Sequence, residues 1–181
     1  MKQLLLILSI ALLTIGNAIS QNRYSEDELT WHEGIIILIS DETPITGIVY
    51  SEHENGQLEW EGNYKAGKKD GLFRYWYESG QLSEEENYKA GKKDGEHKQW
   101  YKNGQLSDKT NFKDGEKDGV NRSWYENGQL SEERNYKAGK KDGLWTGWHE
   151  NGQSQYVKNY KDGVPTSVKE WDKNGNLTKD E

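Results

Sequence analysis

The sequence predicts an all-β fold, an elongated antiparallel β-meander or solenoid made of six hairpin repeats of 24 residues. Turn pairs containing glycine recur at this spacing, aromatic-rich segments of strand length separate them, and no repeat shows a useful helical period. The turn pairs are Asn55-Gly56, Ser79-Gly80, Asn103-Gly104, Asn127-Gly128, Asn151-Gly152 and, one residue early, Asn174-Gly175. The six units begin near Gly47, Gly71, Gly95, Gly119, Gly143 and Thr166.

Each unit is predicted to contain two strands and two turns. In the second unit, "GLFRYWYE" (71–78) is the first strand, "SG" reverses the chain, and "QLSEEENYK" (81–89) is the return strand. The phrase "AGKKDG" (90–95) reverses the chain again, because glycine adopts positive φ at little cost. One unit buries too few side chains to offset the entropy of ordering it, so each copy must pack on the next.

The length of the Ser79-Gly80 loop decides which rings face inward. A two-residue loop would place Tyr77 opposite Leu82, whereas a three-residue loop with Gly80 left-handed would place Trp76 there. We favour the second register, because Trp and Leu are the most regular apolar letters of the array. It predicts one buried stripe per unit, formed by Trp76, Trp100, Trp124 and Trp148, by Leu82, Leu106 and Leu130, and by Tyr88, Phe112 and Tyr136. The other, wetter face would then carry the candidate binding residues Tyr77, Tyr101 and Tyr125.

The N-terminus predicts export. Residues 1–20 combine one lysine, an apolar run over 4–15, and the small residues Ala18 and Ser20, which is the pattern of a secretory signal peptide. The run is shorter than the roughly 20 apolar residues of a membrane span, although a retained membrane helix is the alternative. The mature protein is therefore expected in the periplasm, at the outer envelope or outside the cell. Residues 21–46 are predicted to form a capping segment, and residues 47–181 the repeat array.

The composition limits the chemistry and the partners. Only 31% of the residues are hydrophobic, yet the chain has 8 Trp and 11 Tyr, so rings rather than aliphatic side chains must supply the packing. The net charge of −7, with no large basic block, disfavours nucleic acid as a partner. The absence of cysteine excludes disulfides and thiolate chemistry.

The repeat resembles a known family. The phrase "NYKAGKKDGLWTGWHENGQ" (135–153) is similar to the bacterial variant of the MORN repeat, with its Y-K-x-G-K-x-D-G-x-W and Y-x-N-G patterns. The resemblance covers about residues 47–180, in six copies. Some members of this family are named as antitoxins of toxin–antitoxin systems, which implies protein binding. MORN repeats in general are assembly, scaffold and membrane-proximal modules, so the resemblance implies no catalytic residues.

No motif in the sequence indicates an enzyme, a cofactor or a metal. His32, His53, His97 and His149 share no ligand spacing, and we expect exposed strand or loop positions for them. The acidic run 84–86 lies on a predicted strand and is expected to be solvated. The recurring lysines of the "AGKKDG" turns should align into a basic ridge, which either protects the edge of the sheet or meets an anionic surface.

Two functions remain open from the sequence. The first is an exported, non-catalytic scaffold that binds a protein partner through the exposed face of the sheet. The alternative is a glycan- or cell-envelope-binding module that uses Trp and Tyr rings as stacking platforms.

Overall fold

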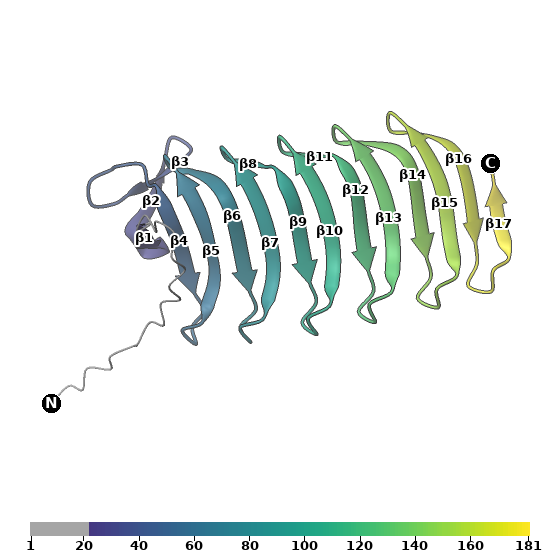
Figure 1. Cartoon of the computed structure of the whole chain (residues 1–181), viewed down its shortest axis with the longest axis horizontal. Helices are drawn as coiled ribbons and strands as arrows, with labels where there is room; N and C mark the ends of the chain where they lie inside the picture. Colours follow the sequence, from purple (N-terminus) through teal and green to yellow (C-terminus); the bar gives the residue numbers. More distant parts are fainter. Residues whose placement is uncertain (1–21) are drawn as a thin grey trace, which may run out of the picture.

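The computed structural model describes residues 22–181, and the predicted signal peptide lies outside these residues. The described chain forms one long sheet of 15 strands and a separate two-stranded sheet, with a single 3-10 turn as its helical segment. Figure 1 shows the long sheet as a row of hairpins that runs from the N-terminal to the C-terminal end of the molecule. The predicted all-β array of antiparallel hairpins is therefore confirmed.

Nearly every strand pairs with the next one along the chain. The segment before the repeats contains β1 (Arg23–Ser25), η1 (Glu26–Glu28), β2 (Leu29–His32) and β3 (Ile35–Leu38). The repeats contain β4 (Gly47–Glu52), β5 (Leu58–Lys65), β6 (Lys68–Trp76), β7 (Leu82–Lys89), β8 (Lys92–Lys93), β9 (Gly95–Trp100), β10 (Leu106–Lys113), β11 (Glu116–Lys117), β12 (Gly119–Trp124), β13 (Leu130–Lys137), β14 (Lys140–Trp148), β15 (Ser154–Lys161), β16 (Val164–Trp171) and β17 (Leu177–Asp180). Among the strands of residues 22–181, only β1 is parallel to its neighbour, β4.

The hairpin loop follows the three-residue register. The backbone N–H of Tyr77 donates to the carbonyl of Gln81 at 2.9 Å, Gly80 has a φ of 81°, and Trp76 lies opposite Leu82. The same pairing joins Trp100 to Leu106 and Trp124 to Leu130. The register that the sequence favoured is the one that the structure has.

A β-bulge in β7 decides which side chains share a face of the sheet. Tyr75 lies opposite Glu84 while Trp76 lies opposite Leu82, so β7 contains one extra residue at this point. Because side chains alternate along a strand, Trp76 and Tyr88 end up on opposite faces of the sheet. The prediction of one stripe shared by Trp76, Leu82 and Tyr88 is wrong for this reason.

The two faces differ in burial. We call the face with Phe73 the inner face and the face with Trp76 the outer face. The middle row of the inner face crosses the sheet through facing residues and holds most of the array's fully buried side chains. This row is Val49, Gly62, Phe73, Glu86, His97, Thr110, Asn121, Arg134, Trp145, Lys158 and Val168.

The predicted core residues are half-buried and divided between the two faces. Trp76, Trp100, Trp124, Trp148, Leu82, Leu106 and Leu130 form a Trp–Leu ridge on the outer face. Tyr88, Phe112 and Tyr136 lie on the inner face, beside the middle row. The fully buried core is thus centred on Phe73 and Trp145 rather than on the regular Trp series.

The "AGKKDG" turns explain why the phrase repeats. Ala90 and Gly91 both have positive φ, 48° and 86°, as a two-residue hairpin turn requires. The N–H of Ala90 donates to Asp70 Oδ2 at 3.0 Å, and the N–H of Gly91 donates to the carbonyl of Lys69 at 2.8 Å. Asp94 and Asp118 bond the next two turns in the same way. The aspartate of each copy therefore holds the turn of the following copy.

The N-terminal segment covers one end of the inner face. Strands β2 and β3 pair with each other, and the N–H of Ile36 donates to the carbonyl of Gly67 at 2.9 Å. Ile36 joins Ile45, Val49, Tyr64 and Phe73 in one hydrophobic cluster. Residues 22–181 contain no helix with the length and apolar character needed to cross a membrane.

Candidate binding surface on the inner face

The inner face changes character along the array. One position per repeat, at the centre of the first strand, shows the change most clearly. It is occupied in turn by Phe73, His97, Asn121, Trp145 and Val168. The face is therefore aromatic under the N-terminal segment, polar in the middle, and aromatic again around Trp145.

Lysines and rings alternate along one side of the inner face. Lys69 Nζ lies 4.4 Å from the ring centroid of Phe73 and 4.7 Å from that of Tyr88. Lys141 Nζ makes the same contacts with Trp145 and Tyr160, at 4.3 and 4.8 Å. Between these ends, Lys93 and Lys117 lie 5.3 Å from the rings of Phe112 and Tyr136. These cation–π contacts join neighbouring repeats.

This arrangement corrects the predicted basic ridge. The second lysine of each Lys-Lys pair folds onto the inner-face rings, and desolvation by burial lowers the pKa of Lys69. The first lysines, Lys68, Lys92 and Lys140, remain exposed at the turns. Only one lysine of each pair is thus left on the open edge.

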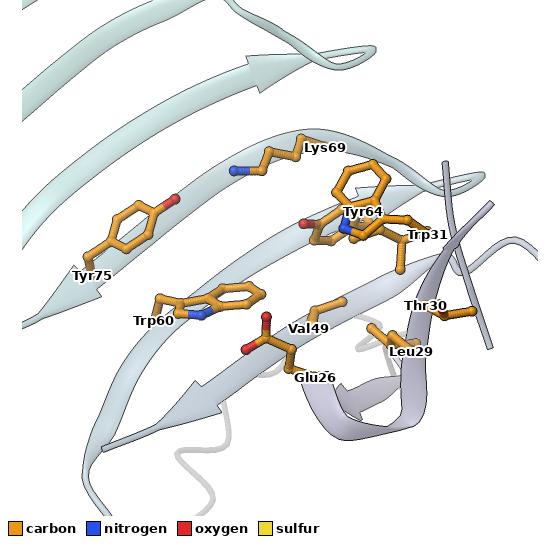
Figure 2. A pocket seen from close by; sticks show the side chains of 10 residues that line it. Glu26, Leu29, Thr30, Trp31, Val49, Trp60, Tyr64, Lys69 and Tyr75 are labelled. Carbon is orange, nitrogen blue, oxygen red and sulfur yellow. The ribbon is translucent and has the colours of Figure 1, made fainter. Parts of the chain in front are cut away.

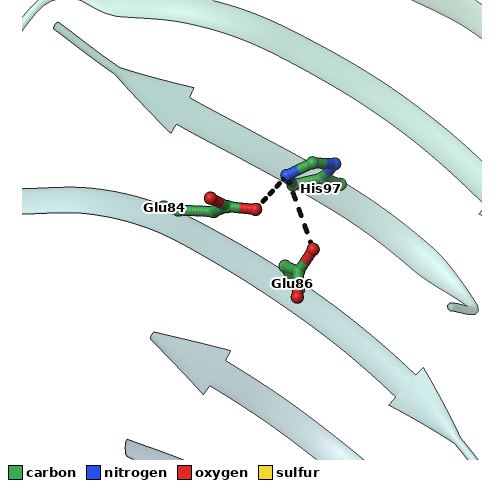
Figure 3. Close-up of side chains that lie close together, drawn as sticks. All are labelled: Glu84, Glu86 and His97. Atoms are coloured by element: carbon green, nitrogen blue, oxygen red, sulfur yellow. Dashed lines mark hydrogen bonds and ion pairs between the residues drawn. The ribbon is translucent and has the colours of Figure 1, made fainter. Parts of the chain in front are cut away.

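Glu84, Glu86 and His97 form a cluster in the polar middle, in which Glu86 is buried and the other two side chains are half-buried (Figure 3). His97 Nε2 lies 2.7 Å from Glu84 Oε1 and 3.8 Å from Glu86 Oε1. Glu86 is only 5% exposed. Its carboxylate accepts a 2.7 Å hydrogen bond from the hydroxyl of Tyr88 and forms an ion pair with Lys93. The expectations of an exposed His97 and a solvated Glu86 are wrong, because both side chains occupy the middle row.

The same cluster has the ligand types of a metal site. The ligand atoms of Glu84, Glu86 and His97 all lie within 4.8 Å of one another. Lys93, however, already neutralises Glu86, so a bound cation would have to displace this ammonium group. The geometry therefore supports an internally compensated polar network.

Glu84 should make the stability of the array pH-dependent. The hydrogen bond from His97 is the largest effect that holds the pKa of Glu84 below its usual value of 4.5. Because the folded pKa is the lower one, Glu84 stabilises the fold above pH 4.5, and this contribution is lost as pH falls through the folded pKa. We expect the difference in unfolding free energy between the wild type and Glu84→Gln to shrink as the pH is lowered through that range. Urea titrations at several pH values measure this difference.

The exposed turn residue Glu78 provides the control for this experiment. Glu78→Gln should unfold with the same pH dependence as the wild type. A Glu84→Gln variant whose stability difference stays constant from neutral pH to pH 3 would contradict the assigned role of Glu84.

Tyr77, Tyr101 and Tyr125 do not form an open binding face. Their hydroxyls donate to the backbone carbonyls of Trp100, Trp124 and Trp148, at 2.6, 2.6 and 2.7 Å. All three tyrosines are half-buried, and each ties one repeat to the next at the hairpin end of the sheet. Sequence reasoning missed this role, although the matching period of the Tyr and Trp series is a signal for it.

Removing one of these hydroxyls should weaken the array measurably. We expect Tyr101→Phe to lower the free energy of unfolding by about 0.5–1.5 kcal/mol, because the carbonyl of Trp124 loses its donor. Tyr125→Phe should cost about the same, since its contact is equivalent. Denaturant midpoints measure both changes. If both variants matched the wild type, the hydroxyl bonds would have no structural role.

The fold and this surface define a single-layer β-repeat protein whose repeats bond to one another through turns, lysines and tyrosines. A family model described as "MORN repeat variant" matches residues 45–66, 69–90, 93–114, 117–138 and 141–162. These matches cover more than half of the chain, and the protein belongs to the MORN repeat variant family. The comparison with curated proteins gave no match.

The family model matches five consecutive repeats, whereas the sequence suggested six. The sixth unit is present in the structure as the hairpin of β16 and β17, although Val164 and Pro165 replace the usual "KKDG" residues there. The last hairpin thus retains the strand pairing of a repeat but has lost part of its sequence pattern.

Proposed function

We propose that this protein is an exported, non-catalytic repeat scaffold that binds a protein partner along its inner face. One observation carries the proposal. Beyond the N-terminal segment, no other element of residues 22–181 lies over the inner face, yet this face carries aromatic rings (Figure 1). An aromatic surface that remains uncovered in a monomer is typical of an interaction site.

The composition of the inner face suits a protein partner. Tyr136 and Tyr160 pack against Trp145 at the C-terminal end, Tyr156 lies on the same face opposite Gly147, and all three tyrosines are half-buried. Tyrosine is enriched at protein interfaces because it offers a large rigid ring with a polar tip. The polar middle adds hydrogen-bonding groups next to these rings. A face that extends over several repeats can also supply the roughly 800 Å² per partner of a standard interface.

Site-specific photo-crosslinking in the native host tests this proposal. Benzoylphenylalanine at Tyr156 places the crosslinker on the inner face, and the same group at Leu144, which is 49% exposed on the outer face of β14, provides the control. We expect a protein to crosslink at Tyr156 and not at Leu144, and the purified partner to bind the wild type more tightly than Tyr160→Ala. Equal crosslinking at both positions would contradict the proposal.

The identity of the captured protein also tests the antitoxin role that the family resemblance implies. That role requires the partner to be a toxin whose activity falls when this protein binds. A partner without toxic activity would leave the scaffold proposal standing and remove the antitoxin role.

Export is a separate part of the proposal. It is supported by the lysine, the apolar run and the small residues of the first 20 positions. We expect the mature protein from the native host to begin near Gln21 and to be found outside the cytoplasm. N-terminal sequencing of the fractionated protein measures this, and a cytosolic chain that still carries residues 4–15 would contradict it.

A further inference from the structure

A cavity of about 330 Å³ lies between the N-terminal segment and the first two repeats (Figure 2). This volume is within the range of about 300–1,000 Å³ that is typical of small-molecule sites. The cavity contacts four aromatic side chains and two charged groups. These are Trp31, Trp60, Tyr64, Tyr75, Glu26 and Lys69.

Trp31 stands out among these side chains because it is 66% exposed. Strand β2 presents it at the rim of the cavity, and it also lines a second hollow next to Lys68 and Lys92. Exposing so large an apolar ring to water is unfavourable. The ring does not anchor the N-terminal segment to the array, since Ile36 and Ile45 already make that contact. The exposed ring is therefore available to a ligand that packs against it.

The two charged groups have free hydrogen-bonding capacity. Within residues 22–181, neither the carboxylate of Glu26 nor the ammonium of Lys69 makes a hydrogen bond or ion pair, although Lys69 lies over the rings of Phe73 and Tyr88 and feels the charge of Glu86. Figure 2 shows Glu26 beside Trp60 and Val49, whereas Lys69 projects from the neighbouring strand toward Tyr75. The cavity thus offers a strong acceptor on one wall and a strong donor on another.

We propose that this cavity binds one pyranose ring of a neutral saccharide. The C–H face of a pyranose carries partial positive charge and stacks on the negative face of an aromatic ring, which Trp31 and Trp60 provide. Its hydroxyls can donate to Glu26 and accept from Lys69 at the same time. A purely apolar ligand would desolvate both charges without a partner, which is costly.

Charged ligands fit the cavity less well. Lys69 would repel a quaternary ammonium group from an otherwise suitable aromatic cage, and Glu26 would repel an anion. The saccharide site lies at the N-terminal end of the array. It is separate from the protein-binding surface around Trp145, so either proposal can fail without the other.

Titration with cellobiose and with N,N′-diacetylchitobiose tests the saccharide site, because their equatorial hydroxyls leave flat C–H faces. The readout is the NMR signal of the indole N–H of Trp31 and of Trp60. We expect saturable shifts of both signals with at least one disaccharide, with a Kd in about the millimolar range. Signals from Trp100 and Trp124, which lie outside the cavity, should not move.

Two substitutions sharpen the test. Trp31→Ala should weaken binding by roughly tenfold without changing the denaturant midpoint, since the ring is exposed. Glu26→Gln should weaken it as well, whereas Glu28→Gln, on the same 3-10 turn but outside the cavity, should bind as the wild type does. The proposal is overturned if neither disaccharide shifts the Trp31 and Trp60 signals, or if Trp31→Ala binds with unchanged affinity.

Discussion

Replacing Phe73 with alanine is expected to lower the free energy of unfolding by about 3–5 kcal/mol, one of the two largest single effects in the array. The ring of Phe73 has no exposed surface, and its centroid lies 5.3 and 5.1 Å from those of Tyr64 and Tyr88. Alanine would leave a cavity at the point where the N-terminal segment meets the first repeats. Urea unfolding followed by tryptophan fluorescence measures the loss.

The other phenylalanine of the chain is the matched control. Phe112 is half-buried on the same face, and its ring contacts include Lys93 and His97. Phe112→Ala should lower the free energy of unfolding by about 1–2 kcal/mol. The loss is smaller because the Phe112 ring is still partly exposed to water and its surroundings can relax into the space it leaves. An equal loss of unfolding free energy for the two variants would mean that the packing is spread evenly along the array rather than concentrated under the N-terminal segment.

The second large effect is expected at Trp145. This ring is 8% exposed, lies 5.2 and 5.0 Å from the rings of Tyr136 and Tyr160, and donates from Nε1 to the carbonyl of Asn135 at 2.9 Å. Trp145→Ala should lower the free energy of unfolding by about 3–5 kcal/mol, because it removes the packed centre of the C-terminal repeats. Denaturant midpoints at constant slope report this change.

Trp148 lies three residues further along the same strand and serves as the control. It is half-buried on the outer face and belongs to the regular Trp series that the sequence had favoured as core. Trp148→Ala should cost clearly less than Trp145→Ala, about 1–2 kcal/mol. A larger loss at Trp148 would restore the outer Trp–Leu ridge as the main core.

The repeat and its hairpin register could be predicted because they depend on short-range patterns. The three-residue loop needs a left-handed glycine at positions such as Gly80, and the 24-residue spacing of these turns is visible in the sequence. The pairing of Trp76 with Leu82 follows directly from the loop length. Local turn chemistry thus determines most of the topology.

The faces could not be assigned, because the β-bulge has no clear signal of its own. One extra residue in β7 moves Tyr88 to the side opposite Trp76, and a slip of one residue exchanges the faces. The core was also missed because it does not repeat. Phe73, His97, Asn121 and Trp145 occupy the same position in successive copies, and a search for periodic letters passes over them.

The end of the array that lies under the N-terminal segment shows a further reason why the core could not be predicted. Gly62 lies opposite Phe73, where a Cβ would approach Phe73 Cε1 to 2.0 Å, while Glu86 occupies the equivalent position in the next repeat. This glycine makes room for the buried ring, so the two residues are meaningful only as a pair. The pairing becomes visible only once β5 and β6 are aligned residue by residue, which the loop length alone does not give.

The central claim is that the inner face is the more buried side of the sheet and holds both the core and the proposed recognition surface. The chain has no cysteine, so single cysteine variants give unambiguous thiol-labelling rates. Thr110 is 3% exposed in the middle row of the inner face, and Thr146 is half-buried on the outer face, so Thr110→Cys and Thr146→Cys form a matched pair. With each native rate divided by the rate of the same variant in denaturant, the thiol at 110 should react at least about tenfold more slowly than the thiol at 146. Equal normalised rates, or slower labelling at 146, would contradict the account.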